Sequence, residues 1–449
     1  MAKENYGKPA VYCPLIKASV LIKSNMKIIR STDTKQIGTY FKRLINTDNR
    51  AASIVKGILA AVSKNGDKAL VTLTARLDGF KTSPKGLIVT KKEFTEARRT
   101  VRPEIISALN TAKMNITSYC KKQKTAGFTI SSGKGAKTGM LIVPVDGAGI
   151  YVPGGKAVYP STVLMNAIPA IIAGVRRIIM CTPADEEGKV NPVILAAADL
   201  CGITDVYKLG GAQAIAAMAY GTKTVRRVDK IVGPGNIYVA IAKRMIFGLA
   251  GIESIAGPSE VLLIADSSAN PEYAAADLLA QAEHDEDATC IMITDSAEFA
   301  KKTLDALKRQ KTCLPKSAII KSALERGCIV IAKNLEEAAA LSNVFAPEHL
   351  QLMTGKNAKL LKLIRNAGAI FIGNYSPVAL GDYIAGTNHV LPTSGSSRFS
   401  SGLGVSDFVK KIGYVKYSKQ ALKGVRSKIE RLAECEGLRA HGKSVGCRL

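Results

Sequence analysis

The stretch GIYVPGGKAVYPSTVLMNAIPAIIAGVRRIIMCTP, Gly149 to Pro183, decides the fold class. It begins with a short apolar run that ends in a glycine turn. A segment with helical spacing of apolar residues follows, closed by Gly174, and a second short apolar run completes the stretch. A strand, a helix and a strand of these lengths make a βαβ unit, in which the two strands are parallel. The sequence therefore predicts an α/β protein built on parallel sheet.

The same alternation continues toward the C-terminus. Further runs that predict strands are TDVYKLGG, VDKIVGPGN, SEVLLIADSS, ATCIMITD, CIVIAK and AIFIGNYS, and helix patterns such as NPVILAAADLCG and NPEYAAADLLAQAEH lie between them. Residues 26–125 instead have mainly the spacing of amphipathic helix, and SKQALKGVRSKIERLAECEGLRAH predicts a final helix of about 20 residues. We expect two Rossmann-like α/β domains with parallel sheets, a helical N-terminal part and a helical C-terminal tail.

These changes of pattern set the expected domain limits. The first 25 residues carry four lysines, one glutamate and no apolar core of signal-peptide length, so we treat them as an extension of doubtful role, with a basic targeting leader as the alternative. The expected parts are 1–25 (extension), 26–146 (helical part joined to the first α/β domain), 147–258 (the other α/β domain), 259–403 (return to the first) and 404–449 (helical tail).

The composition is that of a globular protein with 47% hydrophobic and 22% charged residues, and no run reaches the roughly 20 apolar residues of a membrane helix. The formal net charge of +27 suggests nucleic-acid binding, but the basic residues are spread along the chain, aromatics are 5% and tryptophan is absent. A solvated basic surface is the preferred interpretation. The nine cysteines contain no CxxC pair, which excludes a thiolate zinc knuckle and fits a reducing cytoplasm.

One block of the sequence is acidic, although the chain as a whole is strongly basic. Residues 251–300 hold eleven acids and no lysine or arginine, and they include the stretch QAEHDED, Gln281 to Asp287. A local negative field suits a metal ion or a cationic ligand. A chance acidic face is the alternative.

The chain has four histidines, and each lies in a stretch that also holds an acid. They are His284 in QAEHDED, His349 in APEHL, His389 in GDYIAGTNHVLP and His441 in EGLRAH. Carboxylates orient imidazole rings, and neutral imidazole binds metal. Four histidines in such stretches predict a metal or catalytic site, although each stretch alone is compatible with a structural role.

The first two histidine stretches suggest different tasks. Gln281 and His284 are three residues apart on a predicted helix, so both can face one metal ion; a histidine that favours the helix dipole is the alternative. Glu348 and His349 are adjacent, and neighbours on a helix do not face each other, so they would divide proton-transfer tasks. The alternative is a solvated polar pair at a helix start.

The last two histidine stretches are weaker signals. Asp382 and His389 are seven residues apart in a glycine-rich segment that is either a functional loop or a plain surface loop. Glu436 and His441 end the predicted tail helix, where polar residues are most often at the surface.

Glycine turns before helices mark a second candidate site. VPGGKAVYPS, LGGAQAIAA and GPGN follow predicted strands, and ligands of parallel sheets bind at the carboxyl ends of strands. None is GxGxxG, so these glycines can also serve only to make tight turns. Cys181 and Cys201 lie in apolar runs that predict core positions, and neither GxSxG nor HExxH occurs.

Taken together, these stretches resemble the histidinol dehydrogenase family. The strings that carry the resemblance are YVPGGKAVYPSTVLMNAIPA, LGGAQAIAAMAYGT, VDKIVGPGN, AGPSEVLLIAD, LLAQAEH, APEHL, GDYIAGTNHVLPTSG and EGLRAH, in the family's order, from about residue 26 to the end. The resemblance implies a cytoplasmic, zinc-dependent homodimer that oxidises L-histidinol to L-histidine, via a bound aldehyde, with two NAD⁺ in histidine biosynthesis. In it, 147–258 would bind NAD, and 404–449 would reach the partner subunit.

The resemblance also implies residue roles. Glu348 and His349 would be the acid–base pair: His349 takes the alcohol proton and assists the second hydride transfer, and Glu348 activates water. One zinc ion per subunit would hold the amine and imidazole of the substrate. The implied zinc ligands are Gln281, His284, Asp382 and His441; the substrate residues are Ser259, His389 and Glu436 with His349 and the zinc ligands; the NAD contacts are Tyr151, Gln213 and Asn236.

Two alternatives stay open. Relatives of the family oxidise other small alcohols such as sulfopropanediol, although the ending EGLRAHGKSV is more similar to the histidinol enzymes. A non-catalytic basic protein that binds RNA or an acidic partner would hold zinc but form no NADH.

Overall fold

The computed structural model describes residues 26–42, 49–154, 158–312 and 314–449. The expected extension 1–25 and residues 155–157 of the turn VPGGKAVYPS lie outside the described residues. The chain packs into two compact units, which we call the first unit (residues 1–54 and 254–402) and the second unit (residues 55–253 and 403–449). In the described part of the chain, no helix is long and apolar enough to cross a membrane.

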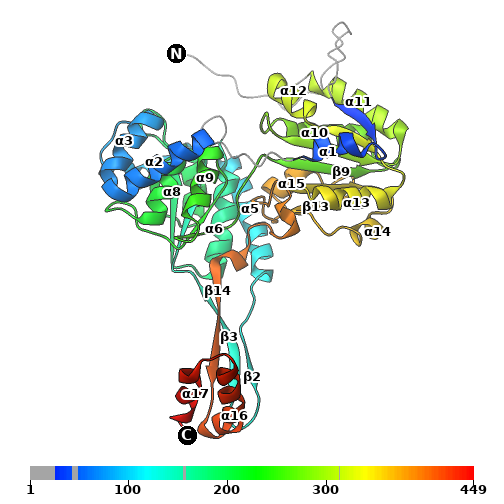
Figure 1. Ribbon diagram of the computed structural model, residues 1–449. Helices are drawn as coiled ribbons and strands as arrows, with labels where there is room; N and C mark the ends of the chain where they lie inside the picture. Colours follow the sequence, from blue (N-terminus) through cyan, green and yellow to red (C-terminus); the bar gives the residue numbers. More distant parts are fainter. Residues whose placement is uncertain (1–25, 43–48, 155–157, 313) are drawn as a thin grey trace. The chain divides into compact units, whose positions relative to one another are not determined.

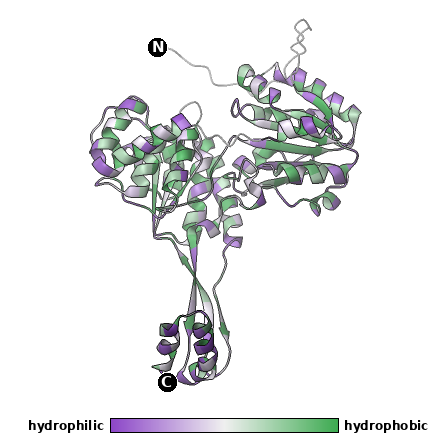
Figure 2. Ribbon diagram, in the orientation of Figure 1, coloured by the Kyte–Doolittle hydropathy of each residue, from purple (hydrophilic) through white to green (hydrophobic). Residues whose placement is uncertain are grey.

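The first unit is built on a six-stranded sheet in which every pairing is parallel. Its strands are almost continuous apolar runs, as expected for strands buried on both faces. Figure 2 shows the hydrophobic residues gathered on these strands. In sheet order they are β1 (Lys27–Arg30), β11 (Cys328–Ile331), β10 (Thr289–Thr294), β9 (Glu260–Ala265), β12 (His349–Met353) and β13 (Ala369–Ile372).

Helices cover both faces of this sheet (Figure 1). Alternate residues of β9 illustrate the division, since Val261 and Leu263 belong to one buried cluster and Leu262 and Ile264 to the other. One face packs against α10 (Pro271–Ala282), α11 (Ala297–Lys311) and α12 (Ser317–Glu325), and the other against α1 (Thr34–Phe41) and α13 (Leu335–Phe345). The short helices are α14 (Asn357–Leu361), α15 (Val378–Tyr383) and η2 (Ser396–Arg398).

The second unit has a five-stranded parallel sheet whose central β4–α6–β5 segment is the βαβ unit predicted from residues 149–183. Helix α6 begins at Pro160 and ends at Gly174, which adopts φ +92°. In order the strands are β6 (Asp205–Lys208), β5 (Arg177–Thr182), β4 (Gly147–Tyr151), β7 (Lys230–Val232) and β8 (Gly251–Ile252). Most of α2 (Asn49–Asn65) belongs to this unit, which begins at residue 55. The other helices are α3 (Asp67–Leu77), η1 (Lys85–Leu87), α4 (Lys91–Thr100), α5 (Pro103–Lys122), α6 (Pro160–Ala173), α7 (Pro192–Leu200), α8 (Gly211–Tyr220), α9 (Ile237–Ile246) and η3 (Val405–Phe408).

Two parallel-sheet α/β units confirm the predicted fold class, but the tail differs from the prediction. Residues after 404 are not all helical, because β14 (Val409–Lys416) pairs antiparallel with β3 (Lys137–Pro144), which also pairs with β2 (Phe128–Ser131). The single predicted tail helix is two helices, α16 (Lys419–Cys435) and α17 (Arg439–Gly446). They are separated at Gly437, whose φ of +71° no helix can contain.

The start of the described chain differs as well. Residues 26–125 were predicted to be mainly helical, but Lys27–Arg30 forms edge strand β1. Its partner β11 lies about 300 residues away in sequence, with Lys27 opposite Cys328. Helical spacing in the following residues concealed a strand that only this distant partner stabilises.

Candidate functional site

Four of the predicted site residues meet at the amino-terminal edge of the six-stranded sheet. His349 is the first residue of β12, Glu348 precedes it, and Ser259 precedes β9, the neighbouring strand. Asp382, from α15, approaches the same histidine: its Oδ1 lies 3.7 Å from His349 Nε2. The site therefore lies at the opposite edge from the carboxyl ends that usually bind ligands in parallel sheets.

Glu348 and His349 are buried side by side. Their side chains are 7% and 6% exposed, and Glu348 Oε2 lies 3.5 Å from His349 Nδ1. The backbone of Glu260 contacts both: its N–H donates to Glu348 Oε2 at 2.8 Å, and its carbonyl lies 3.1 Å from His349 Nδ1. The Glu348 carboxylate also makes a hydrogen bond with the Ser259 side chain.

The sequence interpretation of APEHL as a helix start was wrong. Helix α13 ends at Phe345, Ala346 adopts the left-handed conformation with φ +52°, and the chain then enters β12. Because β12 pairs with β9 and β13 on its two sides, the dyad belongs to the interior of the sheet and is not a solvated pair.

The electrostatics of the dyad follow from this burial. Burial raises the pKa of Glu348 against the lowering effect of His349 and of the Glu260 N–H. Burial disfavours the charged ring of His349, but the carboxylates of Glu348 and Asp382 outweigh it and raise the pKa of His349. Burial likewise opposes charge on Asp382, yet the nearby ring of His349 lowers the pKa of Asp382. Neighbouring buried ionisable groups with shifted pKa values make this place the candidate catalytic site of the first unit.

Asp382 and His389 contact each other directly. The backbone carbonyl of Asp382 lies 3.0 Å from His389 Nδ1, and burial lowers the pKa of the His389 ring. Asp382 is not part of a loop, as the glycine-rich sequence suggested, but belongs to the short helix α15. The chain therefore folds back after α15, so that His389 contacts the residue seven positions before it.

Gln281 and His284 come from the end of α10. The Asn270 side chain caps this helix by accepting from Glu272 N, Pro271 stands at its first position, and the helix ends at Ala282. Gln281 is 3% exposed and its Nε2 has no hydrogen-bond partner. His284 lies just beyond the helix and is exposed; neighbouring protein atoms still desolvate its ring and lower its pKa, against the attraction of Asp382.

The donor set in this unit suits a zinc ion, but it is incomplete. An amide, an imidazole and a carboxylate are accepted zinc ligands, and the unpaired Gln281 amide and the unpaired His349 Nε2 show buried polar atoms that lack partners here. Within residues 26–42, 49–154, 158–312 and 314–449, no three His, Cys, Asp or Glu side chains are grouped so that they could hold a metal. The remaining implied ligand, His441, belongs to α17 of the second unit, where it and Glu436 are exposed.

Two residues next to the site were missed in the sequence. Gln351, two positions after His349 on β12, is completely buried, and its Nε2 donates to Asp277 Oδ2 on α10 at 2.7 Å. This contact joins the strand that carries His349 to the helix that carries Gln281. The sequence signal for Gln351 was the two-residue alternation of side chains along a strand. The interpretation of APEHL as part of a helix concealed this signal.

The predicted cofactor residues lie at the carboxyl edge of the five-stranded sheet. Tyr151 ends β4, and its hydroxyl accepts a hydrogen bond from Gly211 N at 3.0 Å. Gln213, in the first turn of α8, is 1% exposed, and Asn236 caps α9 by accepting from Val239 N. The turn at Gly233 places Tyr151 and the Asn236 loop together, since a Cβ on Gly233 would lie 2.0 Å from Tyr151 O.

Asp78 is a further residue of this edge that the sequence did not reveal. It follows α3, and its Oδ2 accepts a hydrogen bond from Gln213 Nε2 at 3.0 Å. A Cβ on Gly210 would lie 2.8 Å from Asp78 Oδ1, and Gly211 has φ +56°, so both glycines are required by the turn. Close backbone turns at the start of α8 and α9 are the arrangement that a dinucleotide needs, so the residues present fit NAD.

Comparison with known proteins gives one consistent result. A family model described as histidinol dehydrogenase matches residues 42–449. The chain is 50% identical over 395 residues to histidinol dehydrogenase of Clostridium acetobutylicum, covering 88% of this chain and 91% of that one, and 49% identical over 396 residues to that of Syntrophotalea carbinolica, covering 88% and 92%. A crystal structure of histidinol dehydrogenase from Elizabethkingia anophelis superposes with a TM-score of 0.91 at 38% identity, over 95% of this chain and 98% of that one.

Proposed function

The chain belongs to the histidinol dehydrogenase family, and from this premise we propose how its residues carry out the reaction. Its function is that of a histidinol dehydrogenase, the oxidation of L-histidinol to L-histidine. The observation that carries the residue assignments is the buried Glu348–His349 dyad, with Asp382 beside it. Oxidation of an alcohol to a carboxylate removes four electrons and consumes two NAD⁺, each of which accepts one hydride.

His349 is the first proton acceptor. The neutral ring takes the alcohol proton, and the carboxylates of Glu348 and Asp382 stabilise the imidazolium that forms and hold the ring in place, while the Glu260 carbonyl lies against Nδ1 and leaves Nε2 for the substrate. Nε2 has no hydrogen-bond partner, which supports its assignment to the alcohol proton.

Glu348 prepares water for the second half-reaction. A carboxyl group whose pKa is raised by burial can accept a proton near neutral pH, and the Glu260 N–H and Ser259 hold it in position. Water activated in this way adds to the bound aldehyde to form a hydrate, and His349 assists removal of its proton as the second hydride leaves. The proposed mechanism requires no cysteine, and Cys181 and Cys290 are buried in the core.

Gln281, His284 and Asp382 would hold a zinc ion with His441 from a second copy of the chain. Bound zinc would supply positive charge without redox chemistry and orient the amine and imidazole of the substrate. We propose that His441 comes from a second copy of the chain in a homodimer, as the family resemblance implies, so that the tail completes the partner's site. Glu436, beside the same tail turn, and His389 would bind the substrate.

Tyr151, Gln213 and Asn236 would contact NAD, with Asp78 holding the Gln213 amide. We also assign the protein to the cytoplasm, supported by cysteines that include the unpaired Cys120, Cys181 and Cys201. The comparisons favour L-histidinol over sulfopropanediol, since every relative named above is a histidinol dehydrogenase.

The test is the amount of NADH formed per L-histidinol consumed, before and after zinc removal by a chelator. We expect two NADH per substrate, loss of activity on chelation and recovery with added zinc. One NADH per substrate would contradict the role of the dyad in the second half-reaction. Full activity in metal-free protein would contradict the zinc assignment.

A further inference from the structure

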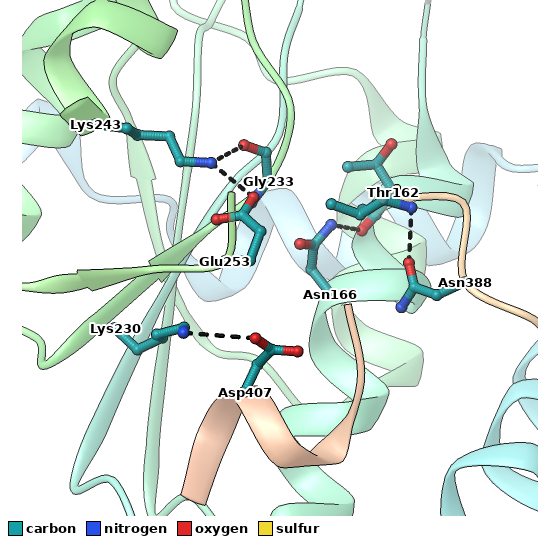
Figure 3. A network of polar contacts seen from close by, with 9 residues as sticks. Thr162, Asn166, Lys230, Gly233, Lys243, Glu253, Asn388 and Asp407 are labelled. Atoms are coloured by element: carbon teal, nitrogen blue, oxygen red, sulfur yellow. Dashed lines mark hydrogen bonds and ion pairs between the residues drawn. The ribbon is translucent and has the colours of Figure 1, made fainter. Parts of the chain in front are cut away.

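A buried ion pair lies behind the turn that joins β7 to α9. Lys243 Nζ of α9 lies 2.6 Å from Glu253 Oε1, which follows β8, and the two side chains are 2% and 4% exposed (Figure 3). Neither residue belongs to the acid–base dyad, the implied zinc ligands or the implied NAD contacts.

The pair holds both backbone groups of one residue. Gly233 N donates to Glu253 Oε1 at 2.8 Å, and Lys243 Nζ donates to the Gly233 carbonyl at 3.1 Å (Figure 3). Gly233 is buried and has φ +118°, and its buried N–H and carbonyl need hydrogen-bond partners. The two charged side chains provide one partner for each.

The position of Gly233 connects this pair to the cofactor edge. Gly233 lies against the backbone of Tyr151, since a Cβ there would be 2.0 Å from Tyr151 O. Three residues later, Asn236 caps α9. Any rotation of the Gly233 peptide would therefore move the carboxyl end of β4 and the first turn of α9 together.

Stability alone gives a poor reason for such a pair. Removing two charges from water is costly, and a buried pair can usually be replaced by apolar side chains with little loss of stability. Glu253 Oε2 has no hydrogen-bond partner, which adds to that cost. What the ion pair provides is a defined backbone conformation at Gly233.

We propose that Lys243 and Glu253 are positioning residues for the dinucleotide: by holding both backbone groups of Gly233, they set the turn from Gly233 to Asn236 in the conformation that receives NAD. This inference rests on the proposed use of NAD at this edge of the sheet. It predicts that the pair controls cofactor affinity without affecting the metal or the alcohol substrate.

The experiment replaces both charges together, with Lys243→Met and Glu253→Met in one variant. Loss of the pair leaves no unpaired charge, but the buried N–H and carbonyl of Gly233 lose their partners, so we expect a folded protein with a lower thermal midpoint than wild type. The dissociation constant for NAD⁺, measured by titration calorimetry, should rise at least tenfold, and KM for NAD⁺ should rise with it. KM for L-histidinol and zinc content should stay within twofold of wild type.

A matched control lies at the other end of the same strand. Lys230 begins β7 and lies 3.6 Å from Asp407 (Figure 3), at the amino edge and away from the Gly233 turn. Lys230→Met should leave the NAD⁺ dissociation constant unchanged.

The outcomes separate the inference from the function on which it rests. A wild-type protein that does not bind NAD⁺ overturns the proposed function and this inference together. A wild-type protein that binds NAD⁺ while the folded double variant binds it equally tightly overturns the inference alone. If the double variant does not fold, Lys243→Met decides, because it removes the donor to the Gly233 carbonyl while Glu253 can become neutral by taking up a proton. Weaker NAD⁺ binding in this folded protein supports the inference, and unchanged binding overturns it.

Discussion

The contact between Gln351 and Asp277 gives the sharpest test of how the first unit holds its site. Gln351 Nε2 donates to Asp277 Oδ2 at 2.7 Å and more weakly to Ser376 O at 3.4 Å, while Gln351 Oε1 has no partner. Gln351 is completely buried and Asp277 is 8% exposed. We consider Asp277→Leu, Gln351→Leu and the double variant.

The expected free energies follow from which groups each change leaves unpaired. Asp277→Leu leaves the Gln351 amide with almost no partner and should cost about 2–4 kcal/mol. Gln351→Leu leaves the Asp277 carboxyl without its donor but also removes the unpaired Oε1, for a net cost of about 1–2 kcal/mol. The double variant replaces the whole polar pair with apolar groups and should stay within about 1 kcal/mol of wild type. The coupling energy between the two positions is therefore about 2 kcal/mol or more.

Urea unfolding of the four proteins, monitored by circular dichroism, measures these differences. The pKa of Asp277 is already raised, by burial and against the lowering effect of the Gln351 hydrogen bond. Because Gln351→Leu removes that effect, its cost should be largest at neutral pH and should shrink as pH falls and the carboxyl is protonated. Costs that simply add in the double variant would refute the argument, since additivity means that the two side chains do not interact.

The same double variant tests positioning. Without the contact, β12 and α10 can shift relative to each other, and a displacement of about 1 Å at a reacting group lowers kcat by roughly tenfold to a hundredfold. Wild-type kcat in the folded double variant would show that the pair has no part in positioning His349.

Three further predictions concern other residues. Glu348→Gln should lower kcat by about 10²- to 10⁴-fold with unchanged zinc content, measured by steady-state kinetics and metal analysis, because the amide cannot accept the proton of water. Asp78→Ala should raise KM for NAD⁺ about tenfold, since Gln213 loses its 3.0 Å contact, and an unchanged KM would contradict the role of Asp78. Burial opposes ionisation of the Glu93 carboxyl, but Lys208 and the hydrogen bonds with Thr90 at the start of α4 outweigh burial and lower the pKa of Glu93. Its stabilisation is therefore complete above the ordinary glutamate pKa and is lost as pH falls through the lowered value in the folded protein, so Glu93→Gln should cost about 1–2 kcal/mol at pH 7 and almost nothing near pH 3 in urea unfolding.

Several parts of the protein could be predicted from local sequence. The βαβ unit from Gly149 to Pro183 follows from a glycine turn, helical spacing and a glycine stop, all of which depend on neighbours within a few residues. The caps of helices α10 and α9 are local as well, because the Asn270 and Asn236 side chains accept hydrogen bonds from backbone N–H groups two and three residues later.

The segments that were predicted wrongly depend on distant partners. Strand β1 exists because Lys27–Arg30 pairs with Cys328–Ile331, and β14 because Val409–Lys416 pairs with Lys137–Pro144. The dyad lies in a strand only because β9 and β13 are present on its two sides. Short segments with mixed periodicity have no strong local preference, so the pairing decides their conformation.

For the site itself, the sequence by itself determined which residues we propose for the chemistry: the histidines with acids beside them, the glutamine before His284 and the glycine turns. Only the tertiary structure decided how they meet. Glu348 reaches a backbone N–H 88 residues earlier, Gln213 reaches Asp78 at a separation of 135, and Asp277 reaches Gln351 at 74. Hydrogen bonds and ion pairs of this kind form between buried groups whose desolvation must be compensated, and the compensating partner is set by the packing of sheets and helices and not by nearness in the chain.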